Sequence, residues 1–316
     1  MRRYLLPIIL LIATFPLGLK ATHIVGGEIY YDYLGNDRYE IKLELYMDCI
    51  NGSPLALELD TIAFIAAFKS SNGQLADTQV VDTVKTTLIK DINYNCLLPP
   101  EDVCVVRYSY RAYMTLPDIR GGYTLAFQRC CRNNTIINLF DQDNTGGTYF
   151  VKIPERGNVG DNSSPRFRQL PPNFLCRGKD FSFDHSAIDP DGDSLVYELC
   201  IPFNGGNSTN PLPRPPSPPP YAPVTMRSGF GLTNFMNANP HLAINPINGR
   251  LTCKPLYLGQ YVIGICVKEY RKGVLLSTAI RDFQFNVIDC RFDVTSAFTL
   301  PKQNCKYQVD FKNKSQ

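Results

Sequence analysis

The chain has 316 residues, of which 44% are hydrophobic and 19% are charged, and its formal net charge is +3. This nearly even balance of charge excludes the strongly basic surface that a nucleic-acid-binding protein requires. The length exceeds that of a single typical domain and predicts two domains, with part of a third.

The first residues have the pattern of a secretory signal peptide. Arg2 and Arg3 precede an apolar run over residues 4–17, and the small residue Ala21 stands at a plausible cleavage position. We therefore expect residues 1–21 to be removed during export; the alternative is an uncleaved anchor. No other run approaches the roughly 18 apolar residues that span a bilayer, so we predict no transmembrane segment after removal of the signal.

Residues 22–156 have the pattern of β-strands. Apolar and polar residues alternate over 39–48 and again over 106–114, which is typical of strands with one buried face. Glycine-containing pairs at 51–52, 72–73 and 121–122 predict turns between the strands. Because a β-sandwich is the usual way to bury one-sided sheets, we predict an N-terminal β-sandwich module over 22–156.

The second half of the chain repeats this pattern. A polar segment rich in Gly, Asn, Asp and Ser predicts a linker over 157–164. Alternating apolar residues predict a second β-sandwich module over 165–290, and its proline-rich run at 211–221 predicts an exposed, rigid loop. Residues 291–316 indicate the first strands of a third β-module that is cut short. The predicted fold class is all-β.

The motif Asp189-Pro190-Asp191-Gly192-Asp193 carries the strongest chemical signal. Its three carboxylates stand at alternate positions directly before a predicted strand. Such a short acidic loop suits Ca²⁺, which takes six to eight oxygen ligands in irregular geometry. The same residues also form a good turn, because proline fixes φ and glycine permits positive φ. Both interpretations, a calcium site and a plain turn, stay open.

The eleven cysteines predict a disulfide framework in an oxidising compartment, because none has the paired C-x-x-C spacing of a zinc site. Since eleven is odd, at least one thiol is unpaired or has its partner outside this chain. Cys200 and Cys266 form the preferred bridge between strands, and the adjacent Cys130 and Cys131 are expected to form two separate disulfides. The full set of candidates is Cys49, Cys96, Cys104, Cys130, Cys131, Cys176, Cys200, Cys266 and Cys290.

No complete catalytic pattern is present, and we predict a non-enzymatic protein with no catalytic residue. The segment Ile24–Gly27 matches the mature start of trypsin-like proteases, but the serine motif Gly-Asp-Ser-Gly-Gly and the histidine motif Ala-Ala-His-Cys are both missing. Glu269 stands between Lys268 and Arg271, which predicts a surface ion pair.

Four blocks of the sequence carry a family resemblance. They are Thr22-His-Ile-Val-Gly-Gly-Glu28 with its continuation to Cys49, Gly121-Gly-Tyr-Thr-Leu-Ala-Phe-Gln-Arg-Cys-Cys-Arg132, Phe183 to Cys200, and Cys266-Val-Lys-Glu-Tyr-Arg271 with Arg281 to Cys290. Together they resemble the N-terminal region of large secreted bacterial proteins described as gliding-motility-associated or PKD-domain-containing. Such proteins are typically exported by the type IX secretion route and carry Ig-like repeats.

The resemblance implies tandem Ig-like or cadherin-like β-sandwich modules, with a PKD-like module at 291–316. Residues 161–167 are similar to the cadherin linker pattern, although two serines replace the usual single residue. By this analogy Asp161 and Asn162 share calcium with the loop at 189–193. Repeats of this type usually contain Leu-Thr-Gly-Thr-Pro, where this chain has Cys253 in place of the glycine. The resemblance therefore marks Cys253 as the unpaired thiol.

The expected function is that of a secreted or cell-surface structural and adhesive protein, with Ca²⁺ as its one expected cofactor. Its expected partners are surface proteins or glycans and not nucleic acid, and we expect further Ig-like repeats beyond Gln316. The alternative is a carbohydrate-binding accessory module of a larger secreted enzyme. The third hypothesis is that the protein is itself a hydrolase.

Overall fold

The computed structural model describes residues 24–50, 52, 60–89 and 103–290, and two short strands further on. Those strands, β18 (Phe298–Thr299) and β19 (Lys312–Asn313), pair in antiparallel fashion. The expected signal peptide (1–21), Cys96 and the remainder of the expected third module (291–316) lie outside the described residues.

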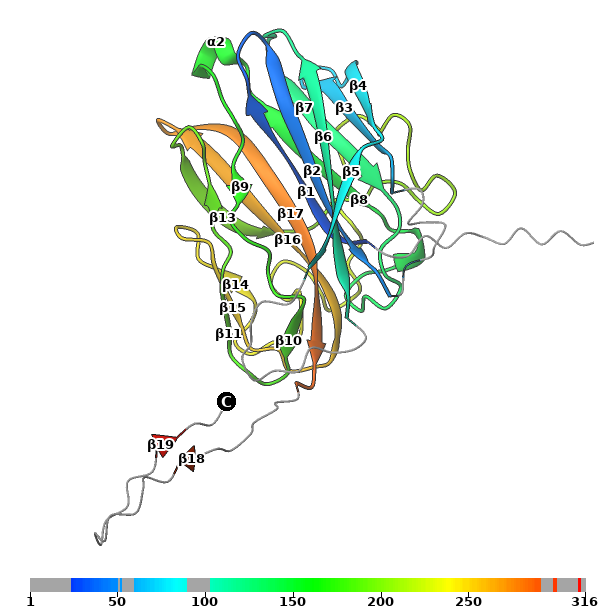
Figure 1. Cartoon of the computed structure of the whole chain (residues 1–316), viewed down its shortest axis with the longest axis vertical. Helices are drawn as coiled ribbons and strands as arrows, with labels where there is room; N and C mark the ends of the chain where they lie inside the picture. Colours follow the sequence, from blue (N-terminus) through cyan, green and yellow to red (C-terminus); the bar gives the residue numbers. More distant parts are fainter. Residues whose placement is uncertain are drawn as a thin grey trace, which may run out of the picture.

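One large sheet runs through both of the predicted modules (Figure 1). Its strands follow the order β13-β16-β17-β1-β2-β6-β5, and β10 pairs with β17. Only the β10–β17 pairing is parallel among the pairings of this sheet. The strands are β1 (Ile24–Tyr33), β2 (Arg38–Asp48), β5 (Val84–Ile89), β6 (Val105–Thr115), β10 (Phe174–Cys176), β13 (Ser194–Cys200), β16 (Gly259–Arg271) and β17 (Val274–Ile288).

The contact between β1 and β17 joins the two halves of the chain. Gly26 pairs with Phe283 and Gly27 with Asp282 in antiparallel register. A Cβ atom on Gly26 would lie 2.2 Å from the backbone oxygen of Asp282, so only glycine permits this close approach. The described parts of 22–156 and 165–290 therefore both contribute strands to one sheet, whereas the sequence predicted separate modules joined by a linker.

The predicted linker is packed against this seam. A helical turn, α2 (Arg156–Val159), covers its start, and after the exposed Gly160 and Asp161 its last residues, 162–164, are buried. The hydroxyl oxygen of Ser164 accepts the backbone N–H of Tyr31 at 2.9 Å, and that of Ser163 accepts the N–H of Tyr33 at 3.2 Å. Because β17 pairs with β1 only at 26–28, these serines satisfy donors on the remaining edge of β1.

Smaller sheets complete the fold. A four-stranded sheet has the order β4-β3-β7-β8, a three-stranded sheet has the order β11-β15-β14, and β12 pairs with β9. Their strands are β3 (Ala63–Lys69), β4 (Leu75–Val81), β7 (Tyr123–Arg129), β8 (Gly147–Ile153), β9 (Arg166–Phe167), β11 (Phe181–Asp184), β12 (Ala187–Ile188), β14 (Ala243–Ile244) and β15 (Arg250–Cys253). No helix in the described part of the chain is long and apolar enough to cross a membrane.

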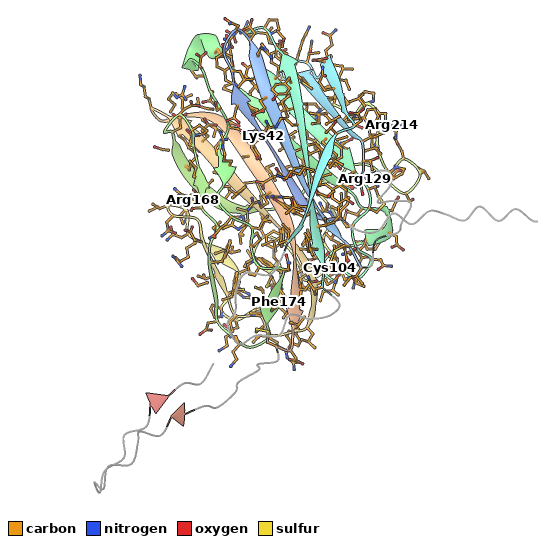
Figure 2. All side chains as sticks on the ribbon, viewed as in Figure 1. Lys42, Cys104, Arg129, Arg168, Phe174 and Arg214 are labelled. Carbon is orange, nitrogen blue, oxygen red and sulfur yellow. A yellow bond between two sulfur atoms is a disulfide. The ribbon has the colours of Figure 1, made fainter. Side chains whose placement is uncertain are left out.

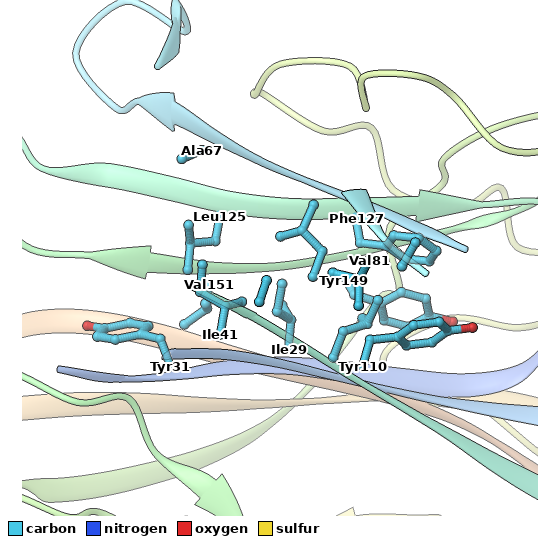
Figure 3. Close-up of a cluster of buried hydrophobic side chains, with 14 of the residues drawn as sticks. Ile29, Tyr31, Ile41, Ala67, Val81, Tyr110, Leu125, Phe127, Tyr149 and Val151 are labelled. Carbon is cyan, nitrogen blue, oxygen red and sulfur yellow. The ribbon is translucent and has the colours of Figure 1, made fainter. Parts of the chain in front are cut away.

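The first core lies between the β1–β2–β6 part of the large sheet and the four-stranded sheet. Figure 3 shows side chains such as Ile29 and Ile41 facing Leu125 and Val151 across this interface. Alternation along β2 places Ile41, Leu43 and Leu45 in the core and leaves the residues between them half-buried, as the period of two predicts. The all-β prediction is confirmed, and this half of the molecule is a β-sandwich.

A second core lies on the β16–β17 part of the large sheet. Tyr261, Ile263 and Phe285 pack there with Leu251 of β15 and with residues from the long connection after β13. That connection contains the proline-rich run, which is partly packed and not wholly exposed as expected. Leu212 within it joins the first core.

Buried ion pairs accompany these cores. In each, an arginine that is almost fully enclosed meets a carboxylate that is also enclosed, and Figure 2 shows the position of Arg129. The pairs are Arg129 with Asp60, Arg132 with Asp282, and Arg281 with Glu28.

Disulfides tie distant segments together. The bridge between Cys200 and Cys266 is the one that the sequence favoured, and Cys253 is free and buried. Further bridges join Cys49 to Cys104 and Cys176 to Cys290. Cys130 and Cys131 are bonded to each other, so the expectation of two separate bridges was wrong.

Candidate metal centre

The acidic motif forms the loop between β12 and β13. One carboxylate oxygen of Asp189, Oδ1, accepts the backbone N–H groups of Asp191 at 3.0 Å and Asp193 at 2.9 Å. Gly192 has a φ of 83°, which permits the tight turn. The three aspartates each offer a ligand oxygen within 4.8 Å of the others. The loop is therefore both a turn and a group of oxygens suited to a hard cation.

The Arg271 guanidinium, at the end of β16, lies against this loop. Its Nε donates to Asp193 Oδ1 at 2.8 Å, and its Nη2 donates to Asp193 Oδ2 at 2.5 Å. The same Nη2 donates to Asn162 Oδ1 at 2.9 Å. Its Nη1 donates to the backbone oxygens of Val159 at 2.8 Å and Asp161 at 2.9 Å. Arg271 thus links the acidic loop to the segment 159–162.

The sequence analogy proposed that Asp161 and Asn162 meet the acidic loop through a shared calcium. The structure brings the two segments together, and the cation between them is the Arg271 guanidinium. The Asp161 carboxylate is largely exposed and lies 3.7 Å from Arg156. The oxygens of Asp161 and Asn162 that face Arg271 are therefore already used as hydrogen-bond acceptors.

Glu269 also belongs to this cluster, although its neighbours in the sequence had predicted a position on the surface. The expected surface ion pair was wrong, because the side chain of Glu269 is 0% exposed, and Lys268 pairs instead with Glu198 at 2.8 Å. In the β13–β16 register Glu269 lies opposite Leu195, two residues after Asp193. Period-two alternation therefore puts Glu269 on the same face as Asp193.

Both carboxylate oxygens of Glu269 are buried without a hydrogen-bond partner, and so is Oδ2 of Asp189. Burial, together with the nearby carboxylates of Asp189 and Asp193, raises the pKa of Glu269 to about 8 in spite of the neighbouring Asn162 side chain. Burial also raises the pKa of Asp189. Unsatisfied buried carboxylates are costly, so this cluster favours a bound cation or a proton.

The charge of the cluster favours a divalent cation. Four carboxylates, those of Asp189, Asp191, Asp193 and Glu269, face a single guanidinium, that of Arg271. The donor set consists only of oxygen atoms, which suits Ca²⁺ or Mg²⁺ and not a thiolate- or imidazole-binding metal. Asp189 and Asp191 would supply the main ligands, because Asp193 is engaged by Arg271. One oxygen of Asp191, Oδ2, already accepts the backbone N–H of Ser163 at 2.6 Å. The buried Glu269 carboxylate adds negative charge beside this group.

His185, which lies close to the motif in sequence, is not part of this cluster by contact. Its ring packs against Phe167 at 4.9 Å and Phe183 at 5.8 Å between centroids. The side chain is 1% exposed, and neither ring nitrogen has a hydrogen-bond partner. Burial, with a contribution from Arg281, holds the pKa of His185 well below its usual value. His185 is thus a neutral core residue.

This burial predicts a pH dependence of stability. Below pH 6.5 an unfolded His185 takes up a proton that the folded state refuses, so the free energy of unfolding falls as the pH falls, by up to about 1.4 kcal/mol per pH unit. Glu269 acts with the opposite sign, because its raised pKa favours the folded state at low pH. The measurement is therefore the difference in urea unfolding between wild type and His185→Phe from pH 6.5 to 5.

Any deficit in the free energy of unfolding of His185→Phe relative to wild type at pH 6.5 should shrink steadily towards pH 5. The control is Ile247→Ala, at an exposed position without a titratable side chain, for which the difference from wild type should not change with pH. A deficit of His185→Phe that is constant over this range would contradict the assignment.

Comparison with known proteins gives no match for this chain among family models, curated proteins or solved structures.

Proposed function

We propose that this protein is a non-enzymatic, secreted or cell-surface protein of structural and adhesive type, which Ca²⁺ stiffens at the acidic cluster. The observation that carries the proposal is the group of ligand oxygens from Asp189, Asp191 and Asp193, which lie within 4.8 Å of one another next to the buried Glu269 carboxylate. A cation here would connect strand β16 to the β12–β13 loop, next to the point where Arg271 holds the segment 159–162.

Several features support an extracellular role. Disulfides with long sequence separations, such as 114 residues for Cys176–Cys290, are typical of oxidising compartments. The all-β architecture with one large shared sheet suits a rigid spacer, because neither half can rotate freely about the β1–β17 seam. The resemblance to gliding-motility-associated surface proteins agrees with such a role and is part of the proposal. Cell-surface proteins or glycans are the proposed partners.

Calcium should raise the stability of the folded protein measurably. Extracellular calcium modules have dissociation constants of about 0.1–1 mM. At 10 mM free Ca²⁺ the expected gain is therefore about 1.4–2.7 kcal/mol, because a ligand that binds only the folded state stabilises it by RT ln(1 + [L]/Kd). The measurement is the melting temperature of the purified protein in CaCl₂ and in excess chelator.

The variants Asp191→Ala and Glu269→Gln should abolish the difference between calcium and chelator, whatever their own melting temperatures are. The matched control is Asp180→Ala, because the Asp180 carboxylate is 86% exposed and outside the cluster. This variant should keep the full calcium effect. Equal melting temperatures of the wild type in CaCl₂ and chelator would refute the calcium site, and turnover of peptides or glycosides by the pure protein would refute the non-enzymatic role.

A further inference from the structure

The outer face of the large sheet carries a polar groove of about 530 Å³ over β1, β2, β6 and β5. This volume is within the range of small-molecule binding sites. We define the polar groove by six of its lining residues, which are Tyr30, Lys42, Glu44, Lys85, Arg107 and Arg111. Figure 2 shows Lys42 on the β1–β2 part of the sheet.

The strand register explains how the sequence builds this groove. Glu44 of β2, Ser109 of β6 and Lys85 of β5 lie in one cross-strand row. In the next row Lys42 lies directly opposite Arg111. Like charges in directly opposed positions destabilise a sheet unless a counter-charge lies between them, and here both cations pair with Glu40.

Positive charge is in excess around the groove. Lys42 pairs with Asp32 and Glu40, each at 2.9 Å, and Arg111 also pairs with Glu40 at 2.9 Å. In total five cationic side chains face three carboxylates, which leaves two positive charges. The cations are Lys42, Lys85, Arg107, Arg111 and Arg166, and the carboxylates are Asp32, Glu40 and Glu44.

Two cations of the groove have donors to spare. The Arg107 side chain is 37% exposed, so its outer guanidinium N–H groups can reach a ligand, whereas its Nε is shielded from solvent 3.5 Å from Glu44 Oε2. Lys85 is exposed and makes no ion pair within the described part of the chain. Arginine and lysine donors of this kind bind carboxylates, and the planar guanidinium does so with two parallel hydrogen bonds.

The lining favours a saccharide over a peptide. Val84 is the one aliphatic side chain of the lining, so the groove offers no apolar pocket of the kind that anchors a peptide side chain. The Tyr30 ring is already covered by Lys42 at 5.8 Å and Arg166 at 5.6 Å, which argues against stacking of a neutral sugar on it. A polar chain that carries carboxylates fits both features.

We infer that the polar groove binds an acidic polysaccharide through its carboxylates, with Lys85, Arg107 and Arg111 as the principal donors. This inference rests on the adhesive role proposed above and names the class of partner. It does not depend on calcium, because the groove shares no residue with the acidic cluster.

The test is the binding of polygalacturonate oligomers to the immobilised full chain, in chelator so that calcium cannot bridge the two. The double variant Lys85→Glu/Arg111→Glu should weaken binding at least tenfold, and wild-type binding should weaken between 50 and 200 mM NaCl. The matched control, Lys152→Glu/Lys179→Glu, makes the same change of net charge at exposed positions outside the groove and should bind as wild type does.

Several outcomes would overturn the inference. The inference fails if polygalacturonate does not bind, or if neutral dextran or polyglutamate binds as tightly as polygalacturonate. It also fails if the control variant loses as much binding as the double variant. Binding of polyglutamate would indicate an acidic peptide as the partner. If binding fails while calcium still raises the melting temperature, the groove assignment falls and the calcium-stiffened role stands.

Discussion

Replacement of Cys176 and Cys290 by alanine together should lower the free energy of unfolding by about 4–5 kcal/mol. The bridge spans 114 residues, and in the chain-entropy model a loop of this length restricts the unfolded chain by about 4.7 kcal/mol. It also fixes the end of β17 to β10, where Cys176 pairs with Ile288 in parallel register. The melting temperature should fall by about 10 °C or more.

Urea unfolding under non-reducing conditions measures this effect, and peptide mapping of the wild type verifies the pairing. The control is Cys253→Ala, which removes a buried cysteine that belongs to no disulfide. This replacement should lower the free energy of unfolding by about 1 kcal/mol through lost packing, including the contact with Met236. A double variant as stable as this control would show that the bridge between Cys176 and Cys290 does not constrain the unfolded chain.

The strands of this fold could be predicted because alternation is a local property. Ile41, Leu43 and Leu45 are buried while Glu40 and Lys42 between them are not, and only the two-residue repeat of an extended chain is needed to foresee this. The same reasoning extended along β16 by one more repeat, from Val267 to Glu269, would have placed Glu269 on the inward face. Its neighbours Lys268 and Arg271 suggested a surface ion pair instead.

The pairing of β1 with β17 could not be predicted in this way. The paired residues Gly27 and Asp282 are separated by most of the chain, and no local pattern identifies partners at such a distance. The single hint was the pair Gly26–Gly27 inside a strand, because glycine at such a position marks a close approach of another backbone. These glycines match the mature start of trypsin-like proteases, whereas in the structure they allow the backbone of β17 to approach closely.

The candidate metal centre was partly predicted. The spacing of Asp189, Asp191 and Asp193 placed three ligand oxygens together, because a five-residue loop leaves them few other arrangements. Arg271 was not predicted as their partner, since it comes from a hairpin end about 80 residues later in the chain. Its guanidinium donates to the backbone oxygen of Asp161 and to Oδ1 of Asn162, the two residues that the cadherin analogy had assigned to calcium.

Replacement of Arg132 by methionine should lower the free energy of unfolding by about 3–5 kcal/mol. The Arg132 side chain is 0% exposed, and its Nη2 lies 2.5 Å from Oδ2 of Asp282, which is 2% exposed. Its Nε also donates to the backbone oxygen of Gly146 at 2.9 Å. Loss of the guanidinium leaves the Asp282 carboxylate buried without a counter-charge, and this uncompensated charge is the main cost.

The double variant Arg132→Met/Asp282→Leu separates this cost from the cost of lost packing. Because it removes both charges, it should recover more than half of the loss, and the difference gives the coupling between the two side chains. The control is Arg177→Met, since Arg177 and Asp289 form an exposed pair at 2.8 Å that should contribute only about 0–1 kcal/mol. If Arg132→Met costs no more than this control in urea unfolding, the carboxylate of Asp282 finds water or another donor when Arg132 is absent. In that case the seam between β1 and β17 is held by its backbone hydrogen bonds and by packing of the two cores, and not by the buried charge.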